Sequence, residues 1–312
     1  MSQAPGALTV GARVQFTALP GIPLVQTGDA LAPLIQAALQ RAELTLEAGD
    51  VLVVTSKLFS RSEGRFVDMS QVVPSDEARA LGLELEKDPA QVELILRESV
   101  GISRKRPGVL VTRHRLGFIS ANAAIDMSNA SPANAAEGTG PWALLLPEDP
   151  DRSARALLSE LGAEGVGLVV SDSFGRPFRV GTVGVAVGVA GIPVVFDQRG
   201  RHDLHGRELQ YTITALADQL AAAADLVAGQ SDEARPVVHI RGLRFTPSDS
   251  STRELLRDPE RPAARDDRHL VDRVDVLLGQ AHRHQRVPGL VPRRGHALAL
   301  RDHGALALRA HQ

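Results

Sequence analysis

One apolar, glycine-punctuated stretch constrains the fold of this 312-residue chain more than any other: GVGLVVSDSFGRPFRVGTVGVAVGVAG, from Gly165 to Gly191. Its first run, Val166–Val170, is long enough for one buried strand, and its last run, Gly181–Gly191, reads as a second. Glycine inside an apolar run indicates that another backbone or a ligand approaches closely. The stretch therefore predicts two buried strands joined by a polar turn, and the simplest alternative is such a pair without any ligand.

The polar residues after the first strand carry the chemistry of this stretch. An acid, two hydroxyls and two guanidiniums fall between Ser171 and Arg179. The carboxylate of Asp172 suits a hard cation, while Arg176 and Arg179 suit phosphate oxygens. Side chains just past the end of a buried strand are held firmly yet can face a cleft, where many α/β proteins bind ligands. We therefore expect a site for a metal-bound anion here.

A second carboxylate, Asp126, lies in a run of small residues and is followed by Asn129. A carboxylate in an apolar setting is costly to bury unless it is paired or metal-bound. Asp126 is therefore the natural partner of Asp172. The apolar run Val51–Val54 repeats the design, because hydroxyls and cations follow it, although a solvated helix start with a Ser cap explains that segment better when it is taken alone.

Composition narrows the class of protein. The formal net charge of −2 gives no reason to expect nucleic acid or an anionic membrane as a partner. The chain has no cysteine, which excludes disulfides and thiolate metal sites, and only 3% of its residues are aromatic. Neither a signal peptide nor a membrane-spanning apolar stretch is recognisable. We expect a cytoplasmic protein.

The hydrophobic pattern predicts an alternation of strands and helices. Strands are expected at Thr9–Phe16, Val51–Val54, Gly108–Thr112, Trp142–Leu146, Pro193–Asp197 and Pro236–Ile240, and helices at Asp29–Arg41, Pro74–Val100 (one or two), Asp149–Leu161 and Tyr211–Val227. The fold class is accordingly α+β, with mixed sheets and flanking helices. We expect residues 1–247 to form the catalytic domain and residues 248–312, rich in Arg and His, to be a partly helical or disordered extension.

The common signatures of nucleotide and hydrolase chemistry are missing. There is no phosphate-binding Gly-x4-Gly-Lys-Ser/Thr loop, no Gly-x-Gly-x-x-Gly, no His-Glu-x-x-His and no Gly-x-Ser-x-Gly. What remains is a distributed set of carboxylates, hydroxyls and basic residues at strand ends. Such a set points to a divalent metal that handles a phosphate ester or a nucleoside triphosphate.

Five runs in order resemble the coenzyme F420-0:L-glutamate ligase family, over about Gly21 to Gly242. They are GDVLVVTSKLFSRSEGR, ISANAAIDMSN, LLLPEDPDRSA, SDSFGRPFRVGTVGVAVGVAG, and the segment from GREL to VVHIRG. The resemblance implies a GTP-dependent ligase that adds L-glutamate to F420-0 and lengthens its γ-glutamyl tail through an acyl phosphate. It further implies a family-specific ligase fold, an intertwined homodimer, two divalent cations (Mg2+ or Mn2+) and K+.

By matched position, the resemblance also implies roles for individual residues. Asp126 and Asp172 resemble catalytic metal ligands, with Ser173 and Gln230 completing the shell of the second metal. The positions that resemble GTP contacts are Gly21, Ile22, Pro23, Leu24, Ser56, Arg61, Asn129, Ala228, Gly229, Gln230, Ser231 and Asp232. Arg176 is added as a catalytic phosphate-stabilising residue from its charge alone. Arg61 stands where archaeal members have a lysine, which differs in hydrogen-bond geometry.

Two other interpretations remain open. One is a GTP- and metal-dependent ligase that attaches an amino acid to another carboxylate-bearing cofactor. The other is a non-catalytic nucleotide-binding paralogue, which the presence of Asp126, Asp172 and Asn129 disfavours.

Overall fold

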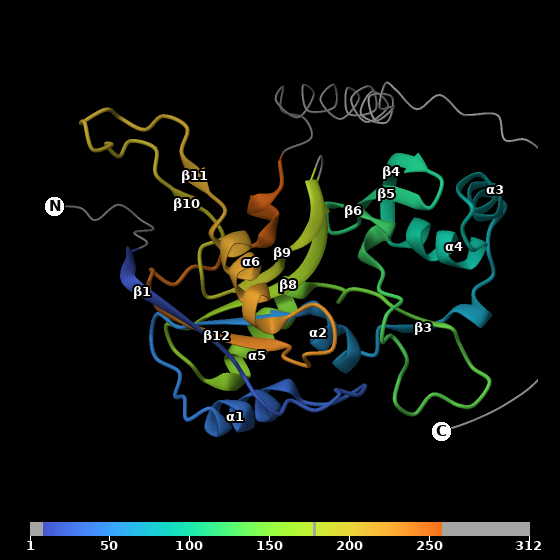
Figure 1. The fold of residues 1–312 in the computed structure, drawn as a ribbon, viewed down its shortest axis with the longest axis horizontal. Coiled ribbons are helices and arrows are strands. Elements are labelled where there is room, and N and C mark those ends of the chain that lie inside the picture. Colours follow the sequence, from blue (N-terminus) through green and yellow to red (C-terminus); the bar gives the residue numbers. More distant parts are fainter. Residues whose placement is uncertain (1–8, 177–178, 258–312) are drawn as a thin grey trace, which may run out of the picture. The chain divides into compact units, whose positions relative to one another are not determined.

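A mixed five-stranded sheet lies at the centre of the fold (Figure 1) in the computed structural model, which describes residues 9–176 and 179–257. The strand order is β1-β12-β2-β8-β9. Strands β2 and β8 run parallel, and every other neighbouring pair in this sheet is antiparallel. The strands of the sheet are β1 (Thr9–Ala18), β2 (Val51–Thr55), β8 (Gly167–Arg176), β9 (Arg179–Ala190) and β12 (Val237–Arg244). The expected α+β class with mixed sheets is confirmed.

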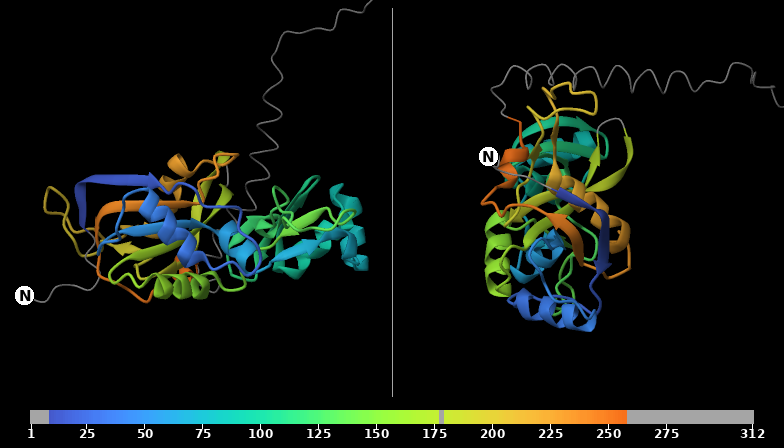
Figure 2. Two further views of the ribbon diagram at one scale, coloured as in Figure 1. Left: turned by 90° about the horizontal axis from the view of Figure 1, so that it is seen from below. Right: turned by 90° about the vertical axis from the view of Figure 1, so that its left-hand side faces the viewer.

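Helices cover both faces of this sheet, and strand β2 shows why. Its residues alternate between two apolar clusters: Leu52 and Val54 face one cluster, and Val51 and Val53 face the other. Helices α1 (Leu31–Arg41), α2 (Ser56–Ser62) and α5 (Pro150–Leu161) contribute to the first cluster, and α6 (Leu216–Ala228) contributes to the second. Figure 2 shows the sheet between these helices. The core is built almost wholly from aliphatic side chains.

A smaller lobe is inserted between β2 and β8. It contains β3 (Phe66–Asp68) paired with β7 (Trp142–Leu144), helices α3 (Asp76–Leu85) and α4 (Pro89–Arg97), and the sheet β4 (Ser99–Arg106), β5 (Val109–His114) and β6 (Ile119–Ala121). The expected helical region 74–100 is thus two helices, and its last residues begin strand β4. The lobe has apolar clusters of its own, centred on residues such as Leu85, Ile95 and Leu110.

The polar residues that follow Val170 lie in a different place from the one predicted from the sequence. Asp172, Ser173 and Arg176 lie within the strand, not in a turn after it, because β8 pairs with β9 along its whole length. Pairing with β2 stops at Ser171, so the outer half of β8 forms a two-stranded arm with β9. The remaining strands, β10 (Phe196–Asp197) and β11 (Ile213–Thr214), pair with each other at the base of a hairpin. Because residues 213–214 form β11, the helix expected from Tyr211 begins only at Leu216.

The glycines of β9 allow two helices to approach the strand closely, as the glycine pattern predicts. A Cβ atom at Gly184 would lie 2.5 Å from the carbonyl oxygen of Ala221 in α6. One at Gly188 would lie 2.6 Å from the backbone of Pro150 in α5. Carboxylates of the same two helices accept hydrogen bonds from β9, since Asp218 accepts from the Ala186 N–H and Asp151 from the Val189 N–H.

We expect Gly184→Ala and Gly188→Ala each to lower the free energy of unfolding by about 3 kcal/mol, because the new methyl group meets backbone that cannot rotate away. Gly175→Ala is the matched control, since a Cβ atom there meets nothing within 4 Å. Urea unfolding of the three variants measures the difference. Equal stability of all three would show that the helices can retreat from the strand.

The compact unit extends beyond the expected domain boundary at residue 247. It runs to Arg257 and includes the short helix η3 (Thr252–Leu255). Ser251 donates its hydroxyl to Asp151 at 2.6 Å, and the Thr252 N–H donates to the same buried carboxylate at 3.2 Å. The separate extension stays a prediction, and residues 258–312 lie outside the described part of the chain.

A chain that ends at Pro247 should therefore be less stable than one that ends at Arg257, by about 2 kcal/mol. The shorter chain leaves the buried carboxylate of Asp151 without three of its donors, the Ser251 hydroxyl and the N–H and hydroxyl of Thr252. Thermal and urea unfolding of the two chains compare them directly. If both unfolded at the same urea concentration, residues 248–257 would contribute nothing to the fold.

Candidate active site

A cavity of about 730 Å³ opens where the central sheet meets the inserted lobe. Six separate stretches of sequence line it: residues 22–25 before α1, residues 53–61 around the junction of β2 and α2, residues 121–129 at and after β6, residues 144–146 at the end of β7, residues 171–173 of β8, and residues 224–238 at the end of α6 and beyond it. The predicted site residues on its wall are Ile22, Pro23, Leu24, Ser56, Arg61, Asp126, Asn129, Asp172, Ser173, Ala228, Gly229, Gln230, Ser231 and Asp232. The structure thus brings together residues that are up to 210 positions apart.

The two carboxylates predicted to be partners are close enough to repel each other. Burial, together with the charge of Asp126, raises the pKa of Asp172 to about 7. The Ser173 N–H, the charge of Lys57 and the Ser56 hydroxyl act in the opposite direction. Asp172 comes from strand β8, whereas Asp126 belongs to the segment that follows β6 and bridges to Leu144 of β7. Two chain segments therefore each supply one carboxylate to the same cavity.

Lys57 is a cation of the site that the sequence analysis did not select. Its Nζ lies 2.5 Å from Oδ2 of Asp126 and donates to the carbonyl oxygen of Ser128 at 3.1 Å. The other oxygen of Asp126 accepts from the N–H and the hydroxyl of Ser128, each at 2.7 Å. The sequence signal that could have identified Lys57 as a site residue is its position directly after Ser56 at the end of β2. A lysine at the start of a helix, however, is usually a solvated side chain.

The turn after α6 contributes hydrogen-bonding groups to the opposite wall. Oε1 of Gln230 accepts a hydrogen bond from the hydroxyl of Ser173 at 2.6 Å, which joins the two residues predicted to share a metal. The carboxylate of Glu233 lies over Gly229 and accepts from the Ser231 N–H at 2.9 Å. Backbone N–H groups of the turn hold the pKa of Glu233 below its usual range. The turn therefore presents N–H groups that already bind an anion.

Arg61 is the most deeply buried cation of the site, with 3% of its surface exposed. Its Nε donates to the carbonyl oxygen of Val25 at 2.7 Å, and its terminal nitrogens donate to those of Asn129 and Ser131 at 3.1–3.3 Å. The guanidinium also lies over the ring of Phe66. The side chain thus fixes two cavity walls to each other through their backbones.

Two predicted residues do not line the cavity. The carbonyl oxygen of Gly21 instead accepts from Arg41, whose side chain occupies the space a Cβ atom would need. Arg176 lies at the outer end of β8 and donates to the carbonyl oxygen of Val180 at 3.3 Å. Ser128 and Asp225 were not predicted as site residues, yet they line the cavity.

The donor set suits a hard divalent cation. Asp126, Asp172, Ser173 and Gln230 offer only oxygen ligands, which Mg2+ and Mn2+ prefer. Among the described residues, no cluster of three or more His, Asp or Glu side chains could hold a metal by itself. Magnesium is typically held by one or two carboxylates together with substrate phosphates, not by a complete protein cage. The residues present therefore fit a metal whose coordination is begun by the protein oxygens and completed by a phosphorylated substrate.

Within residues 9–176 and 179–257, no helix is both long and apolar enough to cross a bilayer.

Comparison with known proteins assigns the family. The model of the family described as F420-0:Gamma-glutamyl ligase matches residues 21–242. The "Coenzyme F420:L-glutamate ligase" of Methanopyrus kandleri is 45% identical over 245 residues, which cover 76% of this chain and 92% of that protein. The proteins of the same name from Natronomonas pharaonis and Methanothermobacter thermautotrophicus are 42% and 41% identical; each alignment covers 79% of this chain, and 93% and 97% of the relatives. The chain therefore belongs to the F420-0:γ-glutamyl ligase family.

Proposed function

We propose that this protein is a GTP-dependent ligase that adds L-glutamate to coenzyme F420-0 and extends its γ-glutamyl tail. The observation that carries the proposal is the cavity of about 730 Å³ in which Asp126 and Asp172 meet beside the turn after α6. The names of the relatives support the choice of acceptor and of glutamate. A family-specific ligase fold is part of the same proposal.

GTP is the co-substrate, and two walls of the cavity receive it. The turn at 228–235 offers backbone N–H groups that now hold the carboxylate of Glu233, and a phosphate oxygen requires the same donors. Residues 22–24 form the facing wall, and Arg61 holds the chain beside them through Val25. The site therefore binds the nucleotide with ordinary loop backbone, without a glycine-rich phosphate loop of the common kind.

Two divalent cations, Mg2+ or Mn2+, would be held by Asp126, Asp172, Ser173 and Gln230, with K+ as an additional requirement. Bound metal would neutralise the charge of the triphosphate and the negative charge that develops while the phosphoryl group is transferred. Asp172 must be ionised to serve as a ligand, and the charge of Lys57 favours that form. Lys57 also holds Asp126 in place through its 2.5 Å ion pair.

The reaction consists of two displacements. A carboxylate oxygen of F420-0 attacks the γ-phosphorus of GTP, and the bond to the β-phosphate oxygen breaks, which gives an acyl phosphate and GDP. The amine of glutamate then attacks the acyl carbon, inorganic phosphate leaves, and the amine loses a proton as the amide forms. Positioning and electrostatic stabilisation supply most of the rate of such transfers.

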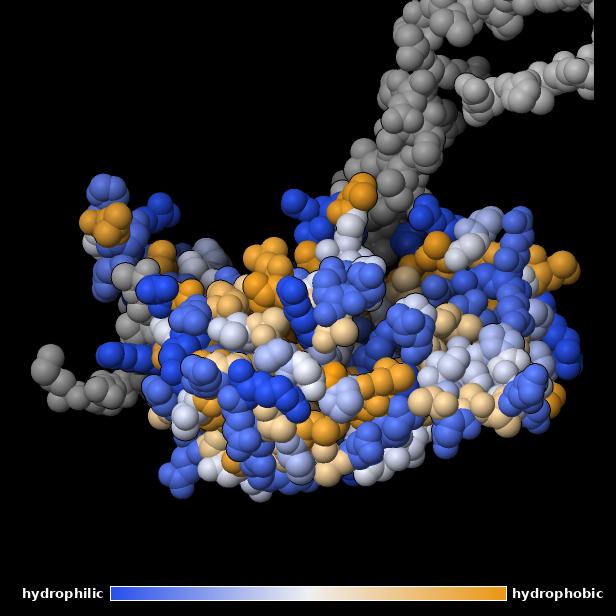
Figure 3. All heavy atoms as spheres, turned by 60° about the horizontal axis from the view of Figure 1, so that its bottom comes forward, coloured by the Kyte–Doolittle hydropathy of each residue, from blue (hydrophilic) through white to orange (hydrophobic). Residues whose placement is uncertain are grey.

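A homodimer is the proposed assembly. The hairpin that contains β10 and β11 (labelled in Figure 1) projects from the body of the protein as an arm, and a protruding arm that carries hydrophobic residues is visible in Figure 3. Its apolar side chains Leu204 and Tyr211 are almost fully exposed. Exposed apolar side chains on a projecting hairpin are typical of a contact with another subunit. A second copy of this chain is the partner that the proposal assigns to the arm.

The stoichiometry of the reaction tests the proposal. Purified protein with F420-0, L-glutamate, GTP, Mn2+ and K+ should release one GDP and one phosphate for each glutamyl group added. Omission of glutamate should stop phosphate release almost completely. If ATP supported the reaction as well as GTP does, the assignment of GTP would be wrong.

A further inference from the structure

The two carboxylates of the site belong to segments that are joined by an aromatic contact outside the cavity. The ring of Phe118, in the turn between β5 and β6, lies 4.9 Å from the ring of Phe174 in β8, centroid to centroid. Phe174 is two residues from Asp172 along the same strand. This contact connects the inserted lobe to the strand that carries one of the proposed metal ligands.

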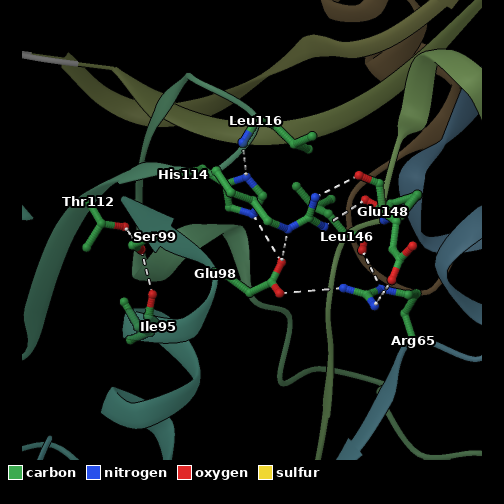
Figure 4. A network of polar contacts seen from close by, with 11 residues as sticks. Arg65, Ile95, Glu98, Ser99, Thr112, His114, Leu116, Leu146 and Glu148 are labelled. Atoms are coloured by element: carbon green, nitrogen blue, oxygen red, sulfur yellow. Dashed lines mark hydrogen bonds and ion pairs between the residues drawn. The ribbon is translucent and has the colours of Figure 1, made fainter. Parts of the chain in front are cut away.

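Phe118 itself is held firmly within the lobe. Its other face stacks on the buried ring of His114 at 4.8 Å, with 7° between the planes, and its carbonyl oxygen accepts from the His114 N–H at 2.8 Å. Figure 4 shows His114 beside Glu98, which also binds Arg65 and Arg115. These arginines reach the carbonyl oxygens of residues 146–148, in the chain that returns to the central sheet.

The path from Phe118 to Asp126 is short and stiff. Strand β6 follows Phe118 directly and is paired with β5. Next come three consecutive non-glycine residues in the left-handed region, Asn122, Ala123 and Ala124, with φ of 51–52°. Left-handed non-glycine backbone persists only where the surrounding structure imposes it, and such positions gather at functional sites. Asp126 follows two residues later, and its own backbone bridges to Leu144.

We propose that Phe118 is a positioning residue that sets the separation of Asp126 and Asp172 through its contact with Phe174. The proposal rests on the proposed metal site. The left-handed turn at 122–124 transmits the position of Phe118 to one carboxylate, and β8 transmits that of Phe174 to the other. Phe118 and Phe174, which lie outside the cavity wall, thereby determine how well the two carboxylates fit one metal cluster.

Substitution of Phe118 is a feasible test because the contact borders a second cavity, of about 550 Å³, and the side chain is only partly buried. A smaller side chain there removes the contact without leaving a closed void. Phe118→Leu is the main variant, Phe118→Tyr retains the ring, and Ile119→Ala is the matched control. Ile119 is the next residue and the first of β6, and it is 55% exposed.

The measurement is the affinity of the full-length protein for Mn2+ alone, by electron paramagnetic resonance of the free ion, beside a thermal unfolding curve. We expect Phe118→Leu to weaken Mn2+ binding about tenfold, as loss of a residue that orients metal ligands does. Phe118→Tyr and Ile119→Ala should stay within about twofold of the parent protein. A lower unfolding temperature of Phe118→Leu with unchanged Mn2+ affinity would show a purely structural role and overturn the proposal.

A second variant acts on the same path without touching the aromatic contact. Ala124→Gly relaxes the left-handed turn, and we expect it to weaken Mn2+ binding about threefold although glycine suits the backbone angle better. Unchanged Mn2+ affinity of Phe118→Leu would refute the positioning role of Phe118, and unchanged affinity of Ala124→Gly would refute the role of the turn in transmitting it. Absence of Mn2+ binding by the parent protein would instead refute the proposed metal site itself, which makes the two failures distinguishable.

Discussion

Asp172→Asn is expected to lower the rate of GTP-dependent glutamate addition about 10³-fold, with little change in stability. The substitution removes the negative charge that would hold a metal, and such a metal contributes several kcal/mol of charge stabilisation to the transition state. The fold should tolerate it, because burial and the charge of Asp126 already disfavour the ionised form of Asp172 and raise its pKa to about 7. Loss of charge relieves that repulsion.

Rates of GDP release and of glutamyl product formation, together with a urea unfolding curve, measure this effect. Glu160→Gln is the control, since Glu160 is exposed on α5 and lies outside the cavity wall. Full activity of Asp172→Asn in folded protein would remove Asp172 from the metal assignment. A large loss of stability would mean that the strand, not the metal, depends on the carboxylate.

Arg61→Ala is expected to lower the free energy of unfolding by about 4 kcal/mol and to abolish nucleotide binding. The guanidinium is the buried donor for the carbonyl oxygens of Val25, Asn129 and Ser131, and its removal leaves those acceptors without their partner. The two cavity walls that it joins would separate. Arg61→Lys should recover only part of the stability, because one ammonium cannot reproduce the planar arrangement of donors.

Chemical unfolding of Arg61→Ala, Arg61→Lys and the exposed-residue control Arg155→Ala gives the three stabilities. Titration of each with GTP in the presence of Mg2+ gives the binding loss. Should Arg61→Ala unfold like Arg155→Ala yet bind no GTP, Arg61 would act as a direct nucleotide ligand instead of a structural clamp.

The sequence predicted which residues lie together around the cavity better than it predicted where the strands begin and end. The pairing of Asp126 with Asp172 followed from the cost of burying a lone carboxylate, and the glycines of β9 correctly indicated the close approach of helices. The extension of β8 to Arg176 was not predictable from the polar run 171–176. Pairing with β9 provides the backbone of residues 171–176 with hydrogen bonds, and these outweigh the weak strand propensity of Ser, Asp and Gly.

Other features depend on tertiary structure that a single sequence does not show. A lysine such as Lys57 is usually solvated, and only the approach of the 126–128 segment makes it part of the site. The role of Arg176 was predicted from charge alone, and its place at the outer end of the β8–β9 arm does not support that prediction. The left-handed turn at 122–124 has no signal either, since alanine rarely adopts that conformation.

The central claim is that this protein attaches glutamate to F420-0 at the cost of GTP. The most direct test is a mass spectrum of F420-0 after incubation with the protein, GTP, L-glutamate, Mn2+ and K+, beside a reaction without GTP. The account predicts a product heavier by one or more glutamyl groups that forms only when GTP is present. Unchanged F420-0, in the presence of folded protein that binds GTP, would contradict it.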